Sequence, residues 1–377
     1  MTSVAALPLP SGDPASEGFS TARFERVHDL MQGATRSGDY LGAVTLIARN
    51  GKIVDWRAYG HLGPAKNVAM RPDSIFRIYS MTKTVATVAA LMLVDAGKIA
   101  LDDRLGAHLP EFSNRPVTIR QLLTHTSGFA TPSTAMEMSA DLKAYSEAAA
   151  ASAQAAAPGS RFEYNSVNTE VVSRVIEVVS GKSFETFLRE RIFLPLGMPD
   201  TGFTVPVDQR HRIAAMTSTD GNGRLMSWPA GDSKVPGESM RPYFSGAGGL
   251  YSTAGDFARF CQMLLDGGRL DGTTILARDT VATMMTNQLT SLDPPRSQFG
   301  EGFGLGGFVN LDQPGRKRPG SAGAFGWSGA AATYYMIDPH ERMFAILLMQ
   351  HLPRGLSRDP LKISLTFYNL IYQSLMK

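Results

Sequence analysis

The sequence has one cysteine, few histidines and almost no excess of charge, and each shortage excludes a class of protein. A lone cysteine, Cys261, excludes an intramolecular disulfide framework. The seven histidines are scattered from His28 to His351 without the spacing of a zinc site, so we expect no metal and no cofactor. The fold needs no such support, because 377 residues with 43% hydrophobic content can bury a large core.

Charge and hydropathy exclude other partners. The 37 lysines and arginines outnumber the 34 acidic residues by only 3 and form no patch, so we expect no nucleic-acid partner. No uncharged apolar run is long enough to span a membrane. The first twenty residues also lack the charged start and apolar run of a secretory signal. The sequence therefore predicts a soluble, cytoplasmic protein with no membrane partner, and it does not indicate an oligomeric state.

Hydrophobic periodicity places strands at both ends of the chain and helices between them. Two apolar runs at 43–49 and 53–59 meet at Asn50-Gly51, which is typical of a β-hairpin. Further strands are predicted at 304–309, 331–338 and 343–349. Helices are predicted at 22–32, 85–94, 145–157, 171–179 and 361–376.

This order predicts an α/β fold with one mainly antiparallel sheet, built from both chain ends and flanked by helices, and with an all-helical subdomain inserted. We expect a polar lead at 1–20, an α/β domain at 21–84 plus 245–377, and a helical domain at 85–204. Periodicity fails at 205–244, where glycine, proline and serine rise. Long loops of this kind often border active sites, and we expect the same here.

One short motif carries a catalytic signal. Ser80-Met-Thr-Lys83 opens an apolar helical stretch, and side chains at i and i+3 share one helix face. A serine hydroxyl is a weak nucleophile until a nearby base takes its proton, and a lysine amine can serve as that base. Ser80 is therefore the predicted nucleophile and Lys83 its base.

The motifs around Ser80 follow a familiar order. They are Phe76-Arg-Ile-Tyr79, Leu122-Leu-Thr-His-Thr-Ser-Gly128, Pro158-Gly-Ser-Arg-Phe-Glu-Tyr164, Pro195-Leu-Gly-Met198 and Gly246-Ala-Gly-Gly-Leu250. This series resembles the serine β-lactamase and penicillin-binding-protein superfamily, and most of all its family VIII carboxylesterases beside the class C β-lactamases. The resemblance covers nearly the whole chain from Phe24 and implies the β-lactamase-like fold.

The resemblance also implies roles for further residues. Tyr164 matches the tyrosine that points at the nucleophile and would return a proton to the leaving alkoxide, paired with Lys83. The backbone N–H groups of Ser80 and Ala330 would form the oxyanion hole. The class C pattern has asparagine two places after this tyrosine, whereas this chain has Ser166, which weakens any expectation of amide recognition.

A second departure concerns the substrate. The strand motif Lys-Thr-Gly of β-lactamases is replaced by Trp327-Ser328-Gly329, which removes the lysine that meets the substrate carboxylate of a β-lactam. An apolar wall at this place fits neutral esters. The expected reaction is hydrolysis of small carboxylic esters with short to medium acyl chains, through an acyl-enzyme on Ser80. We expect Trp327, Tyr79, Trp228 and Tyr243 to line the substrate pocket.

Other interpretations remain open at this point. On the same fold, the chain is alternatively a β-lactamase, a D-amino-acid peptidase or a non-catalytic penicillin-binding sensor. Gly326-Trp-Ser328-Gly-Ala330 nearly matches a nucleophile elbow, but the β-branched, aromatic run after it argues against the helix that an elbow needs. His125 is a candidate triad base, although a buried, hydrogen-bonded histidine is the expected role.

Overall fold

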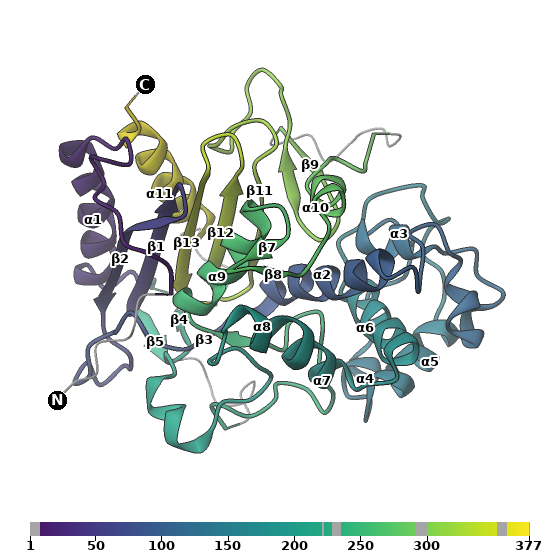
Figure 1. Cartoon of the computed structure of the whole chain (residues 1–377). Coiled ribbons are helices and arrows are strands. Elements are labelled where there is room, and N and C mark those ends of the chain that lie inside the picture. Colours follow the sequence, from purple (N-terminus) through teal and green to yellow (C-terminus); the bar gives the residue numbers. More distant parts are fainter. Residues whose placement is uncertain (1–7, 221, 228–234, 291–299, 353–359, 377) are drawn as a thin grey trace.

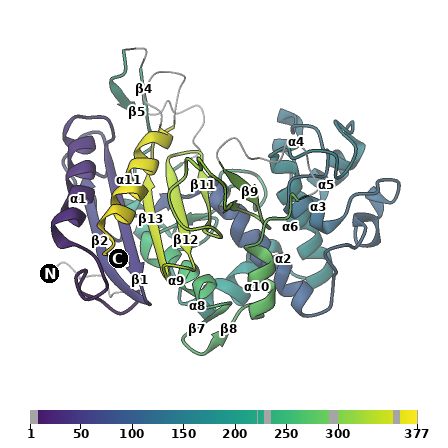
Figure 2. The same cartoon turned by 90° about the horizontal axis from the view of Figure 1, so that it is seen from above.

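The computed structural model describes residues 8–220, 222–227, 235–290, 300–352 and 360–376. Trp228, one of the expected pocket residues, lies outside this range. In Figure 1 both chain ends lie at one end of the molecule beside helices α1 (Thr21–Arg36) and α11 (Pro360–Ser374). The helices of the middle of the chain occupy the opposite end, and Figure 2 shows the same division from above.

A seven-stranded antiparallel sheet of order β2-β1-β13-β12-β11-β10-β9 joins the two ends of the chain. Strand β1 (Gly42–Arg49) pairs with β2 (Lys52–Gly60) on one side and with β13 (Met343–Met349) on the other. Asn50 and Gly51 between β1 and β2 have φ of 53° and 78°, the left-handed pair that a tight hairpin turn needs. The predicted hairpin and the sheet built from both termini are therefore confirmed.

The rest of the sheet comes from the last quarter of the chain. Its strands are β9 (Glu301–Phe303), β10 (Phe308–Asn310), β11 (Phe325–Gly329) and β12 (Thr333–Asp338). Three two-stranded pairs lie apart from it: β3 (Phe76–Arg77) with β6 (Tyr251–Ser252), β4 (Thr217–Thr219) with β5 (Leu225–Ser227), and β7 (Arg269–Leu270) with β8 (Thr273–Thr274).

Helix α2 (Thr82–Asp95) runs through the centre of the molecule. Its sequence is mainly valine, alanine, leucine and threonine, and every residue from Thr82 to Leu93 is buried. Helix α6 (Ser166–Ser180) packs along it, and α9 (Ala254–Leu265), which carries the buried Cys261, packs on β13 and β1. The other helices are α3 (Ile119–Leu123), α4 (Thr134–Glu137), α5 (Leu142–Ala151), α7 (Phe184–Leu188), α8 (Leu194–Leu196) and α10 (Arg278–Met284).

Three expectations of secondary structure were wrong in extent. The strand predicted at 304–309 is mostly the turn between β9 and β10, where Gly306 takes a left-handed φ of 75°, and only its last two residues belong to β10. The helix predicted at 145–157 ends at Ala151, where Ser152 turns to extended backbone with ψ of 159°. The stretch 205–244 is not wholly irregular, because it holds the 3₁₀ helix Val207–Arg212 and the β4–β5 hairpin. The side chain of Asp220 accepts the backbone N–H groups of Asn222 and Arg224 and so closes the turn of that hairpin.

A buried histidine joins α1 to β2. His28 Nδ1 lies 2.8 Å from Glu25 and Nε2 lies 3.0 Å from Asp55, whose second charged neighbour is Arg57. Burial disfavours the charged ring, but the hydrogen bonds to Asp55 and Glu25 outweigh it and raise the pKa of His28 above its usual 6.5. Within the described ranges, no helix is both long and apolar enough to cross a bilayer.

Candidate active site

Ser80 and Lys83 meet at the start of α2. A single 3₁₀ turn, Tyr79–Met81, precedes the helix, and Tyr79 holds the left-handed φ of 43°, which is uncommon for a residue other than glycine. Lys83 is buried, with Nζ 3.4 Å from Ser80 Oγ and 2.6 Å from the carbonyl oxygen of Ala247. The lysine is thus close enough to exchange a proton with the serine, and a backbone acceptor fixes its position.

Tyr164 lies directly before α6, beside this pair. Its ring centroid is 5.0 Å from Lys83 Nζ, and its hydroxyl oxygen accepts a hydrogen bond of 3.2 Å from Trp327 Nε1. The two aromatic rings are 5.1 Å apart. Tyr164 keeps 40% of its surface exposed, whereas Trp327 is buried. Ser80, Lys83, Tyr164 and Trp327, all predicted from the sequence, are therefore brought together from three distant parts of the chain.

The end of β11 reaches the Ser80 turn from the other side. Gly329 is packed so closely that a Cβ there would lie well inside 3.0 Å of the Ile78 carbonyl oxygen. Thr333 Oγ1 donates a hydrogen bond of 3.3 Å to the same carbonyl. Ala330 follows Gly329 directly, so its backbone lies beside the Ser80 turn. The oxyanion hole expected from the backbone N–H groups of Ser80 and Ala330 stays a prediction.

The remaining expected pocket residues differ in their surroundings. Tyr79 is half-buried in the turn before Ser80. Tyr243 is buried, and its ring lies 5.4 Å from that of Tyr145 on α5.

The structure decides between the rival interpretations of two residues. Ser328 lies within β11 opposite Tyr334, and the next element is strand β12, so the strand–turn–helix of a nucleophile elbow is not formed. His125 is buried, and its Nδ1 lies 3.2 Å from the Asn165 amide and 3.0 Å from Asn168 Nδ2. His125 thus binds the segment that follows Tyr164. It is buried and hydrogen-bonded, as expected from the sequence.

Sequence reasoning missed one buried acid of the site, Glu170 on α6. Its carboxylate accepts hydrogen bonds from Ser245 Oγ at 2.5 Å and from the Gly246 N–H at 2.9 Å. Burial raises the pKa of Glu170 to about 7, although the Ser245 hydrogen bond and the positive charge of Lys83 act in the opposite direction. Its position three residues after Val167 puts an acid on the apolar side of the helix, a signal visible in the sequence.

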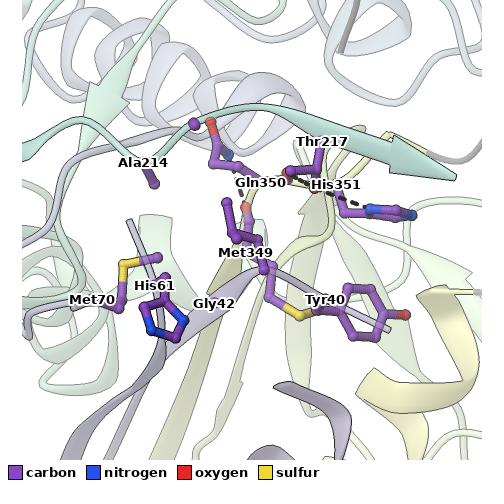
Figure 3. Close-up of a pocket in the computed structure, with 11 residues that line it drawn as sticks. Tyr40, Gly42, His61, Met70, Ala214, Thr217, Met349, Gln350 and His351 are labelled. Carbon is purple, nitrogen blue, oxygen red and sulfur yellow. Dashed lines mark hydrogen bonds between the residues drawn. The ribbon is translucent and has the colours of Figure 1, made fainter. Parts of the chain in front are cut away.

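A separate shallow depression lies at the end of β1 and β13 (Figure 3). Tyr40, His61, Met70 and His351 are among its lining residues, and Ser80 is not. Gln350, also in the lining, bonds both backbone groups of Arg77 on β3. This part of the fold therefore supports the strand that leads to Ser80 and is not part of the reactive cluster.

Comparison with known proteins agrees with this geometry. The family described as Beta-lactamase matches residues 27–365. Protein Rv1367c of Mycobacterium tuberculosis (strain H37Rv) is 33% identical over 355 residues, 83% of this chain and 86% of that protein. Esterase EstB of Burkholderia gladioli is 28% identical over 94% of this chain and 97% of its own length. The D-alanyl-D-alanine-carboxypeptidase/endopeptidase AmpH of Escherichia coli K12 is 27% identical over 82% and 80%.

A solved structure extends the likeness to the fold. The structure of "EstCE1, a hydrolase with promiscuous acyltransferase activity" superposes with a TM-score of 0.81, covering 95% of this chain and all of that one at 24% identity. The sheet built from both chain ends and the helical region between them are shared. By sequence and by fold, the chain belongs to the β-lactamase family, within the superfamily of serine β-lactamases and penicillin-binding proteins.

Proposed function

We propose that this hydrolase of the β-lactamase superfamily is a carboxylesterase of the family VIII type, which cleaves small esters with short to medium acyl chains. The observation that carries the proposal is the contact between Trp327 and Tyr164. At the strand position where a β-lactamase has its carboxylate-binding lysine, the indole is buried and its N–H donates to the Tyr164 hydroxyl. A neutral, apolar wall favours a substrate without a charge at that place.

The reaction follows from the positions of the side chains. Lys83, together with Tyr164, takes the Ser80 proton as Oγ attacks the ester carbonyl, and the oxyanion is held by the N–H groups of Ser80 and Ala330. Tyr164 then gives a proton to the departing alkoxide, and the alcohol leaves. Water attacks the acyl-enzyme with the same groups acting in reverse, which releases the acid and restores Ser80.

The relatives support both this function and a second candidate. EstB is named as an esterase and aligns along almost its whole length. AmpH, named as a D-alanyl-D-alanine carboxypeptidase and endopeptidase, is nearly as similar. A D-amino-acid peptidase or β-lactamase activity is therefore the second candidate. It comes second because Trp327 stands where these enzymes have a lysine for the substrate carboxylate.

Hydrolysis of p-nitrophenyl acetate, butyrate and decanoate, with the cephalosporin nitrocefin in parallel, tests the proposal. Wild-type protein is compared with Ser80→Ala, Lys83→Ala and, as a control, Ser328→Ala. We expect fast ester turnover that disappears in the first two variants and persists in Ser328→Ala. Faster turnover of nitrocefin than of every ester would favour the second candidate. Absence of any turnover and of fluorophosphonate labelling at Ser80 would favour a binding protein.

A further inference from the structure

The carboxylate of Glu170 binds the backbone turn whose next carbonyl binds Lys83. Glu170 is completely enclosed, and its two oxygens accept from the side chain of Ser245 and the backbone of Gly246. The next residue, Ala247, accepts the Lys83 ammonium at 2.6 Å. Only one peptide unit therefore separates the Gly246 N–H, which Glu170 binds, from the Ala247 carbonyl, which binds Lys83.

The turn approaches α6 so closely that only glycine fits. A Cβ at Gly246 would lie well inside 3.0 Å of Ser173 Oγ, one helical turn after Glu170. Ser173 Oγ is itself occupied by a hydrogen bond of 2.8 Å to the Thr169 carbonyl. The turn is thus seated on the surface of α6, with Glu170 as its polar anchor.

We propose that Glu170 is a positioning residue for the reaction, and that its carboxylate fixes the place of the Lys83 amine through the turn at Ser245, Gly246 and Ala247. This inference rests on the proposed role of Lys83 as the base. It does not depend on the class of substrate, because any acyl transfer by Ser80 needs the same proton acceptor.

The charges around Glu170 explain why it influences Lys83. The titratable groups that face it are Lys83 from α2, Tyr145 from α5 and Tyr243 from the loop before the turn. Lys83 is the cation among them, and its positive charge favours the ionised form of Glu170, which accepts both hydrogen bonds from the turn. Because burial raises the pKa of Glu170 to about 7, its charge changes within the range where activity is measured.

The variant Glu170→Gln separates the effect of the charge from that of the hydrogen bonds. Its amide oxygen can accept from the Gly246 N–H while its NH₂ group donates to Ser245 Oγ, so both hydrogen bonds persist without the negative charge. Glu170→Ala removes both bonds. Glu177→Gln is the matched control, because Glu177 lies on the same helix and also binds a backbone N–H, that of Phe184.

The experiment measures kcat, KM and the rate of fluorophosphonate labelling of Ser80 from pH 5 to 9. In Glu170→Gln we expect the part of the pH dependence of kcat/KM and of the labelling rate that follows the ionisation of Glu170 near pH 7 to disappear, because glutamine does not ionise. In Glu170→Ala we expect kcat to fall by about 10- to 100-fold with little change in KM, since the amine loses its fixed position. Glu177→Gln should keep both pH profiles.

A purely structural role makes a different prediction. It would lower the thermal stability of Glu170→Gln and leave the pH profiles unchanged, and that result would overturn the proposal. Failure of Glu170→Ala to fold does not rescue the idea, because Glu170→Gln alone decides it. If labelling responds to pH as expected while esters are not hydrolysed, the proposed esterase function fails and the role of Glu170 stands.

Discussion

Gly329→Ala is expected to disable the site without changing any reactive side chain. The new Cβ would lie well inside 3.0 Å of both the Ile78 carbonyl oxygen and Thr333 Oγ1, a separation that real Cβ atoms essentially never show. The Ile78 carbonyl is held in place, because it accepts hydrogen bonds from the Met81 N–H at 3.1 Å and from the Thr333 hydroxyl at 3.3 Å. The end of β11 must therefore move away from the turn that carries Ser80.

The size of the effect follows from how little movement such a site tolerates. Catalytic groups have to stay within about 0.5 Å of their productive positions, and two clashes of this depth exceed that tolerance. Displacing an oxyanion-hole donor costs about 10²- to 10³-fold in kcat. We expect Gly329→Ala to lower kcat/KM for p-nitrophenyl butyrate by about 100-fold, and overpacking to destabilise the fold by about 1 to 3 kcal/mol.

The assay combines ester hydrolysis with a urea unfolding curve at the same pH. Gly63→Ala is the control, because a Cβ at Gly63 has no heavy atom within 4 Å, and this variant should match wild type in both measurements. Wild-type kcat/KM in a folded Gly329→Ala protein would refute the reasoning, since it would mean that the spacing of β11 from the Ser80 turn does not limit the reaction.

Three further changes test other contacts. Trp327→Phe removes the indole N–H that donates to Tyr164 and should lower kcat/KM for short esters about 5-fold, the equivalent of one hydrogen bond of about 1 kcal/mol. His28 is more readily protonated in the folded state, because its pKa is raised above 6.5. Its contribution to the free energy of unfolding is therefore complete below pH 6.5 and is lost as pH rises through the raised pKa. The fall in the urea midpoint over that pH range should be smaller in His28→Asn than in wild type. Tyr335→Phe removes the hydroxyl that lies 2.7 Å from Thr84 Oγ1 and should reduce the free energy of unfolding by about 1 kcal/mol, with ester hydrolysis unchanged.

The sequence predicted those parts of the fold that local patterns determine. Asn50-Gly51 specifies its own turn, and the apolar run of α2 has to be buried wherever it packs. The alanine-rich helix was overextended because alanine favours helix without marking its end. The helix ends where it does because the Arg115 guanidinium binds the carbonyls of Ala150 and Ser152, a tertiary contact that local propensity does not contain.

The same distinction explains which part of the candidate site was found. Ser80 and Lys83 are three residues apart, in the 3₁₀ turn before α2 and in the first turn of α2, so their contact is local. Tyr164 and Trp327 came from the order of motifs that resemble a known superfamily. The Ala247 carbonyl was missed because a backbone atom has no signature in a sequence. Glu170 was missed although an acid on the apolar side of α6 can be seen in the sequence.

Backbone contacts also determine where this site is most vulnerable. The Ala247 carbonyl holds Lys83, the Ile78 carbonyl faces Gly329, and the turn at Gly246 rests on α6. No substitution removes a backbone carbonyl, but a methyl group added at either glycine pushes it out of place. Because the site is assembled from distant segments through such close approaches, the glycines that permit them should be nearly as sensitive to substitution as the residues that carry the chemistry.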